Sequence, residues 1–131
     1  MSEALTTALA TLEQALNAAL ALDPKSGQRL ARLEGRVVAM ELSGTGLRIC
    51  LRADDEGFLA VMGSFDGEAD TSLRGAPMSM LRMATGASDT LFGGGVEIDG
   101  DVELGQRFQR IIQQVDIDWE EHISRIVGDV A

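Results

Sequence analysis

The spacing of apolar residues changes abruptly at Arg36, and this change constrains the fold more than any other feature of the sequence. Before it, leucines recur at steps of three and four residues, which places them on one side of a helix; they are Leu5, Leu9, Leu12, Leu16 and Leu20. This helix is expected to run to about Leu22, because the Asp23-Pro24 pair that follows ends it. After Arg36, apolar residues recur at every second position, which is typical of β-strands. The chain therefore combines helices with a sheet.

Residues 36–42 and 47–52 predict an antiparallel hairpin, and the turn Ser43-Gly44-Thr45-Gly46 joins them. The alternation places one set of apolar side chains on a common face: Val38, Met40 and Leu42 in the first segment, Leu47, Ile49 and Leu51 in the second. The next strand, residues 58–62, is apolar at every position. A strand tolerates this only if both of its faces are covered or if one faces an apolar cavity.

Two further strands are predicted at residues 68–73 and 96–98. In the first of them, Ala69, Thr71 and Leu73 are expected on the inner face of the sheet. The first four strands are interpreted as antiparallel to one another.

Capping signals mark the remaining helices. Pro77 begins a methionine-rich helix that reaches about Thr85, since proline suits the first helical turn. Asp101 and Asp118 are placed to cap two later helices with their side chains. A short helix over residues 25–33 ends at Gly35. The pattern indicates an α+β fold in a single domain, residues 1–131, with N-terminal helices at 3–33 and the sheet and other helices at 35–131.

Composition and charge disfavour several classes of function. With 131 residues, 45% of them apolar, the chain suits one domain with a core rather than disorder. The net charge of −10 disfavours nucleic-acid binding. Residues 88–131 hold three basic and ten acidic side chains, so basic protein partners are favoured over an anionic membrane. A single cysteine, with no signal peptide or long apolar segment, predicts a cytoplasmic location.

No catalytic or metal-binding arrangement stands out in the sequence. His122 is the only histidine and Cys50 the only thiol, and no neighbour in the sequence completes a nucleophilic triad, so both are interpreted as structural. The G-x-S-x-G elbow of serine hydrolases is absent. Asp99 and Asp101 lack the twelve-residue ligand loop of a calcium site. We therefore expect no enzymatic activity, metal or cofactor.

The remaining signal is a soft apolar interior. The chain has six methionines, one tryptophan and no tyrosine, and methionine adapts its shape to irregular partners. A long lipid chain would fit between the strand at 58–62 and the helix at 77–85, with few polar groups to hold its head; the alternative is that these residues only fill the core. The residues predicted to line a lipid site are Phe58, Ala60, Met62, Met78, Leu81, Met83, Leu91, Phe92 and Phe108.

Several motifs resemble known lipid-binding domains. Residues 33–38 (LEGRVV), 69–77 (ADTSLRGAP) and 95–101 (GVEIDGD) resemble the sterol-carrier-protein-2 type. The segments GDVELGQRFQ, DIDWEE and SRIVGDVA, which lie within residues 100–131, resemble the narrower bacterial UbiJ family. The resemblance covers essentially the whole chain, and it implies a five-stranded antiparallel sheet covered by helices that enclose an apolar pocket.

The UbiJ resemblance implies a non-catalytic accessory factor of ubiquinone biosynthesis. Such a factor binds the polyprenyl tail of ubiquinone intermediates, or another lipid such as a phospholipid, and presents it to the biosynthetic enzymes in a soluble complex. Family members continue into a C-terminal coiled coil that engages the small partner UbiK, and that region is absent from residues 1–131. The alternative is a structural assembly module whose apolar groove binds a partner helix. A homodimer through the leucine stripe of the first helix is also an open alternative.

Overall fold

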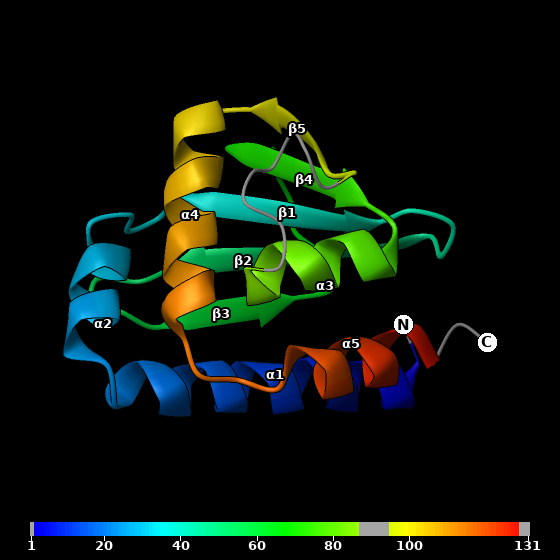
Figure 1. The fold of residues 1–131 in the computed structure, drawn as a ribbon, viewed down its shortest axis with the longest axis horizontal. Coiled ribbons are helices and arrows are strands. Elements are labelled where there is room, and N and C mark those ends of the chain that lie inside the picture. Colours follow the sequence, from blue (N-terminus) through cyan, green and yellow to red (C-terminus); the bar gives the residue numbers. More distant parts are fainter. Residues whose placement is uncertain (1, 87–94, 129–131) are drawn as a thin grey trace.

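The computed structural model of the chain describes residues 2–86 and 95–128, which form a five-stranded sheet with helices on one face and along one edge (Figure 1). The elements are α1 (Glu3–Ala21), α2 (Pro24–Ala31), β1 (Val37–Leu42), β2 (Leu47–Ala53), β3 (Leu59–Met62), β4 (Thr71–Gly75), α3 (Pro77–Thr85), β5 (Glu97–Gly100), α4 (Val102–Gln114) and α5 (Trp119–Gly128). The predicted α+β fold class is confirmed.

The strands are arranged in the order β3-β2-β1-β4-β5. β1 and β2 form the predicted antiparallel hairpin, and the β2–β3 and β4–β5 pairs are also antiparallel. β1 and β4 are parallel, so the prediction of a purely antiparallel sheet is wrong at this pair. The physical reason is the crossover at residues 63–70, which returns the chain to the far side of β1 before β4 begins. Asp70 fixes this crossover, because its carboxylate accepts a hydrogen bond from Val37 N–H (2.7 Å) and its own N–H donates to the Val37 carbonyl (2.8 Å).

The two faces of the sheet carry separate apolar clusters. One face belongs to the main core; its strand residues include Val38, Leu42, Ile49, Leu51 and Leu73. The other carries a small cluster of Val37, Ala39 and Cys50, against which Met62, Phe65 and Ala69 pack. The alternation predicted for the hairpin is therefore confirmed. Ala69 was expected on the inner face, and that expectation is wrong because β4 begins only at Thr71.

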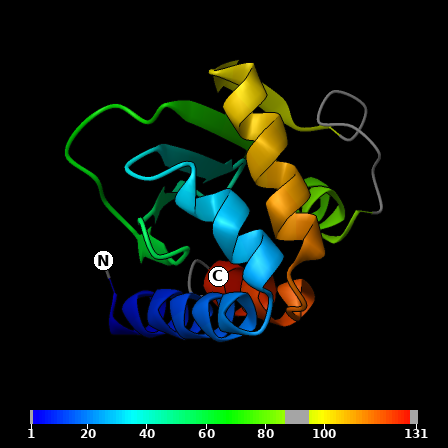
Figure 2. The same cartoon turned by 90° about the vertical axis from the view of Figure 1, so that its left-hand side faces the viewer.

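Helices α3 and α4 cover the main-core face, whereas α1 and α5 run side by side along the β3 edge (Figure 1, Figure 2). The leucine stripe of α1 packs into the main core, and each of its five leucines is at most 9% exposed. The stripe is thus used within the chain, which leaves it unavailable as the contact of a homodimer in this conformation.

The open edge of β3 is closed by polar side chains of α1. Asn17 accepts a hydrogen bond from Leu59 N–H (2.9 Å) and donates one to the Leu59 carbonyl (3.0 Å), and Glu13 accepts one from Val61 N–H (2.8 Å). A strand edge normally exposes such groups and pairs readily with other chains. Here, the amide and carboxylate of one helix take the place of a neighbouring strand.

The predicted caps of the last two helices are confirmed. Asp101 accepts a hydrogen bond from Leu104 N–H (3.0 Å) at the start of α4, and Asp118 accepts one from Glu121 N–H (3.1 Å) at the start of α5. Each satisfies a backbone donor that the first helical turn leaves unpaired. These caps fix where α5 begins and therefore which of its residues face the core.

Candidate functional site

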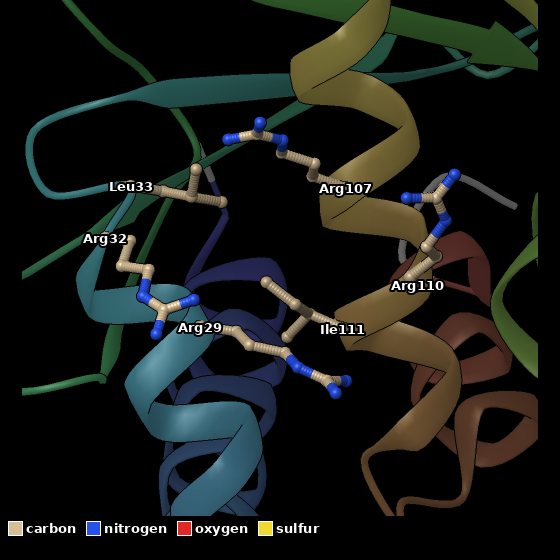
Figure 3. Close-up of a pocket in the computed structure, with 6 residues that line it drawn as sticks. All are labelled: Arg29, Arg32, Leu33, Arg107, Arg110 and Ile111. Atoms are coloured by element: carbon tan, nitrogen blue, oxygen red, sulfur yellow. The ribbon is translucent and has the colours of Figure 1, made fainter.

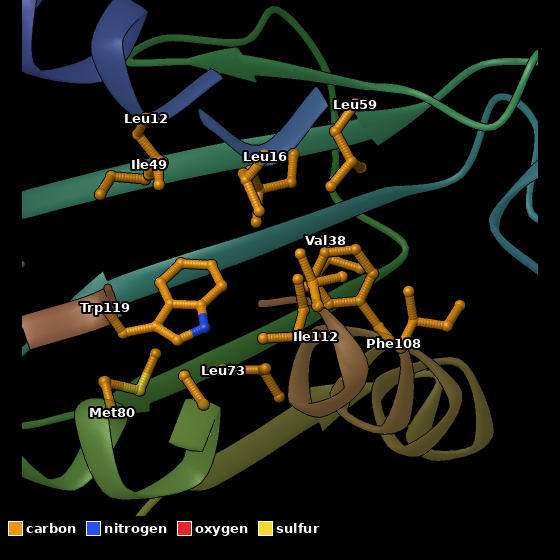
Figure 4. Packing of buried hydrophobic residues seen from close by; sticks show 14 of the residues in the cluster. Leu12, Leu16, Val38, Ile49, Leu59, Leu73, Met80, Phe108, Ile112 and Trp119 are labelled. Atoms are coloured by element: carbon orange, nitrogen blue, oxygen red, sulfur yellow. The ribbon is translucent and has the colours of Figure 1, made fainter. Parts of the chain in front are cut away.

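A small apolar cavity of about 40 Å³ lies between the sheet and three helices. Its lining comes from α1, the β1–β2 hairpin, α3 and α5, and Figure 4 shows the surrounding packing. The lining residues are Leu12, Leu16, Met40, Leu42, Ile49, Leu51, Met80, Ala84, Trp119, His122, Ile123 and Ile126. Only Trp119 and His122 among them carry nitrogen in their side chains, so the cavity is suited to hydrocarbon.

Two nitrogen atoms of this lining, Trp119 Nε1 and His122 Nδ1, have no hydrogen-bond partner in the described part of the chain. Both residues are 8% exposed. A buried polar atom that stays unpaired costs about 1–3 kcal/mol. The indole N–H is a hydrogen-bond donor, and the imidazole nitrogen donates or accepts according to its tautomer. From the sequence, His122 was interpreted as structural and its pairing with Trp119 was not predicted. Their spacing of three residues on one helix was the available signal, since it indicates a shared face.

Four of the nine predicted lipid-site residues lie in or against the main core, and none of these four belongs to the cavity lining. Met83 and Phe108 are buried in that core, and Phe58 and Leu81 are half-buried against it. Met62 packs against the small cluster on the opposite face of the sheet. The sheet therefore separates Met62 from the other four side chains.

Of the other four predicted residues, Ala60 and Met78 do not belong to the cavity lining. Ala60 is half-buried in β3, and Met78 is 61% exposed on α3. Leu91 and Phe92 lie outside the described residues. The nine-residue set remains a prediction for the lipid-bound protein.

A second concave feature, which we call the arginine groove, lies between α2 and α4 and has a volume of about 430 Å³ (Figure 3). Arg29 of α2 and Arg32, at the C-cap of that helix, line one side, and Arg107 and Arg110 of α4 line the other. Leu33 and Ile111, which are 6% and 3% exposed, complete the lining. This groove was not predicted from the sequence, because the two arginine pairs are far apart in the chain. The i,i+3 spacing within each pair was the available signal, since it places both arginines on one helical face.

The sequence pattern that defines the SCP-2 sterol transfer family matches residues 16–113 of the chain. The chain belongs to this family. The resemblance to SCP-2 domains that the sequence motifs predicted is confirmed. The matched residues include the whole described lining of the arginine groove and seven of the twelve residues that line the apolar cavity.

The SCP-2 chain is similar to individual proteins as well. It is 27% identical over 124 residues to the ubiquinone biosynthesis accessory factor UbiJ of Salmonella typhimurium, which covers 93% of this chain and 61% of that protein. It therefore spans about three-fifths of the length of this relative. The likeness to UbiJ that the C-terminal motifs predicted is confirmed.

Two solved structures share the SCP-2 fold. A UbiJ-SCP2 ubiquinone synthesis protein superposes with a TM-score of 0.68 at 22% identity, covering 80% of this chain and 88% of that one. The sterol carrier protein domain 2 of Helicoverpa armigera superposes with a TM-score of 0.58 at 15% identity, covering 85% and 92%. At such identities, the likeness shows the fold alone.

The thiol of Cys50 and the imidazole of His122 lie on opposite faces of the sheet in this SCP-2 domain. Cys50 belongs to the small cluster, whereas His122 lines the cavity. Burial raises the pKa of the Cys50 thiol, which disfavours the reactive thiolate. Within residues 2–86 and 95–128, no three His, Cys, Asp or Glu side chains are grouped so as to hold a metal ion. None of the helices in those ranges combines the length and apolar character needed to cross a bilayer.

Proposed function

We propose that this chain is a non-catalytic accessory factor of ubiquinone biosynthesis that binds the polyprenyl tail of ubiquinone intermediates, or another lipid, and presents it to the biosynthetic enzymes. The observation that carries the proposal is the apolar cavity between the sheet and α1, α3 and α5 in an SCP-2 domain. The similarity to UbiJ supports the pathway. Other ubiquinone biosynthesis proteins, UbiK among them, are the proposed partners, and the cytoplasm is the proposed location.

The cavity must enlarge to hold such a tail. Its present volume of about 40 Å³ is far below the roughly 300–1,000 Å³ of sites that enclose drug-sized ligands. Six of the twelve lining residues belong to α1 and α5, which lie side by side at the β3 edge. Movement of these two helices away from the hairpin would open the cavity without breaking any strand pair. If α1 moves, the hydrogen bonds between β3 and the side chains of Glu13 and Asn17 must break, and water must take their place.

We further propose that, once the cavity enlarges, the unpaired nitrogens of Trp119 and His122 bind an oxygen that the ligand carries next to its apolar tail. A phenol or quinone ring meets this requirement, because its oxygens accept hydrogen bonds and the ring itself is apolar. The proposal therefore places the ring near α5 and the tail along the leucines of α1. A wholly hydrocarbon ligand would leave both nitrogens unpaired.

Extraction of the purified domain with organic solvent, followed by mass spectrometry, tests the proposal. We expect a polyprenylated lipid to co-purify, and added polyprenylphenol to be taken up. Ile123→Glu places a charge in the half-buried part of the cavity lining and should abolish uptake. Val127→Glu is the matched control, because Val127 is half-buried on the same helix outside that lining. Absence of both co-purified lipid and uptake in the unmodified domain would overturn the proposal.

A second comparison tests the position of the ring. Trp119→Phe keeps an aromatic side chain but removes the indole N–H. We expect it to weaken uptake of a polyprenylphenol more than uptake of the corresponding polyprene hydrocarbon. Equal weakening of both would mean that Trp119 contributes only packing.

The structural assembly module remains the alternative function. It required an exposed apolar stripe on α1, whereas Leu5 and Leu9 are 9% and 4% exposed. No observation on the described residues favours it over lipid binding.

A further inference from the structure

The arginine groove concentrates positive charge on an acidic protein. The chain carries 11 basic and 21 acidic residues, yet four arginines line this single groove and no acidic residue belongs to its described lining. Close like charges repel one another. In Figure 3 the Arg110 guanidinium lies on the side of α4 that faces away from α2, so the charges that meet in the groove are those of Arg29, Arg32 and Arg107. Three guanidinium groups in one groove leave a site in which an anion is favoured.

Ion pairing distinguishes the groove arginines from most others. Arg36, Arg48, Arg74 and Arg125 each have a carboxylate partner. In the groove, only Arg107 has one among the described residues, namely Glu103 at 2.6 Å. Arg29, Arg32 and Arg110 form no ion pair with any described residue.

The carboxylate of Asp23, which acts electrostatically on Arg29, is already engaged elsewhere. It accepts hydrogen bonds from Ser26 N–H (3.2 Å) and from the Ser26 hydroxyl (2.7 Å), and so caps α2. It therefore does not occupy the groove as a counterion. The donors of Arg29 and Arg32 remain available to an external ligand.

The shape and floor of the groove restrict what that ligand can be. Its volume of about 430 Å³ lies within the roughly 300–1,000 Å³ of small-molecule sites, whereas a protein partner usually meets a flatter and larger surface. Leu33 and Ile111 belong to the main core and form an apolar part of the lining. Guanidinium groups bind phosphate oxygens in pairs, which suits a multiply charged phosphoryl group.

We propose that the arginine groove binds a small amphiphile with a phosphate or diphosphate head, the head between Arg29, Arg32 and Arg107 and the adjoining apolar part on Leu33 and Ile111. This site is separate from the apolar cavity, because the two linings share no residue. The inference therefore does not depend on the lipid proposed for the cavity. A free organic phosphate and a phospholipid in a membrane both present this chemistry.

Titration calorimetry with three soluble probes tests the proposal: hexyl phosphate, inorganic phosphate and hexanol. We expect hexyl phosphate to bind at least about tenfold more tightly than inorganic phosphate, because methylene groups of its alkyl chain leave water when they lie against the apolar part of the lining. Hexanol should not bind at the groove. Equal affinity for hexyl phosphate and inorganic phosphate would overturn the proposal that the ligand is an amphiphile. If neither compound binds, the proposal of an anion site in this groove is wrong.

Matched double variants locate the binding. The double variant Arg29→Gln, Arg32→Gln should weaken the binding of hexyl phosphate by at least about tenfold, since both charged donors on the α2 side of the groove are lost. Arg52→Gln with Arg82→Gln removes the same charge from two exposed arginines outside the groove and should change the affinity little. Equal weakening by the two double variants would show a general charge effect and overturn the site. The urea midpoint of each double variant should equal that of the unmodified protein, because all four arginines are exposed. This control shows that the variants fold.

Vesicle sedimentation separates the two sources of phosphate. Binding to phosphatidylglycerol vesicles but not to phosphatidylcholine vesicles, lost in the α2 double variant, would identify a membrane lipid as the source. Binding of hexyl phosphate without vesicle binding would identify a free organic phosphate. Binding of an acidic peptide in place of hexyl phosphate, lost in the same variant, would overturn the small-molecule site in favour of a protein contact.

Discussion

Replacement of Leu16 by alanine tests whether the small cavity is the place where the interior can accept a ligand. Leu16 is fully buried and lines the cavity. The substitution removes three carbons, a loss of about 2.5 kcal/mol at about 0.8 kcal/mol each. The extra void adds about 1–2 kcal/mol, at about 24 cal/mol per Å³ of unrelaxed space. We therefore expect the free energy of unfolding to fall by about 4 kcal/mol.

The enlarged cavity is expected to bind small apolar molecules, because dry cavities of this kind accept benzene. At about ten times the dissociation constant, benzene would restore about 1.4 kcal/mol of stability. For a chain of this length, that corresponds to a rise in Tm of about 5 °C in a thermal scan. The control is Leu30→Ala, because Leu30 is equally buried but lies outside the cavity lining. It should lose similar stability without the same rise in Tm.

Two outcomes of this comparison would refute the reasoning. An equal benzene effect on both variants would mean that any void in this core binds apolar ligands. No benzene effect on Leu16→Ala would mean that the helices collapse around the site. If either alanine variant fails to fold, Ile126→Val and Ile112→Val form a milder pair, each expected to cost about 1 kcal/mol. Ile126 lines the cavity and Ile112 does not, and both are 2% exposed.

Three further predictions concern the rest of the fold. Gly57→Ala should destabilise strongly, because at this φ of +87° an added Cβ would lie 2.8 Å from the carbonyl carbon of Gly27 in α2 and closer still to its oxygen. Gly35→Ala (φ +79°, open space) should cost only about 1–2 kcal/mol. Equal urea midpoints for the two variants would contradict this close approach. A backbone N–H of α4, and after it Arg36, lower the pKa of Asp101 in the folded protein. The ionised Asp101 carboxylate therefore stabilises the fold fully above the ordinary pKa of 3.8, and this contribution is lost as the pH falls through the folded pKa. Asp101→Asn should accordingly flatten the acid dependence of the urea midpoint, and an unchanged slope would contradict it. Burial raises the pKa of Cys50, so a thiol reagent should label only unfolded protein, and rapid labelling of the native chain would contradict that.

Local pattern predicted the elements of this fold well. The alternation in the hairpin separates the side chains of the two sheet faces, and the caps at Asp101 and Asp118 mark helix starts, because these signals act within a few residues. The parallel pairing of β1 with β4 was missed because side-chain alternation sets the face of a strand but not its partner or direction. Asp70 carries that information through its contacts with Val37, which lies 33 residues earlier.

The candidate sites were harder to predict, because both are assembled from distant segments. The methionine-rich helix did contribute Met80 to the cavity, but the residues that supply unpaired nitrogens come from α5. Glu13 and Asn17 interrupt the apolar run of α1 in the sequence, and only the structure shows that they close the β3 edge. Polar residues within an apolar helix are therefore informative about what that helix covers.

The net charge of −10 does not describe every part of the surface. Most of the arginines outside the groove are held by carboxylates, so the acidic surplus resides elsewhere on the surface. The rate at which a charged ligand approaches depends on the total charge of the protein, which is negative. The strength of binding depends on the local charge, which is positive at the arginine groove. An anion would thus approach this domain slowly and yet be held once it arrives. Raising the salt concentration should therefore speed association of hexyl phosphate while weakening its affinity, a combination that a uniformly acidic surface could not produce.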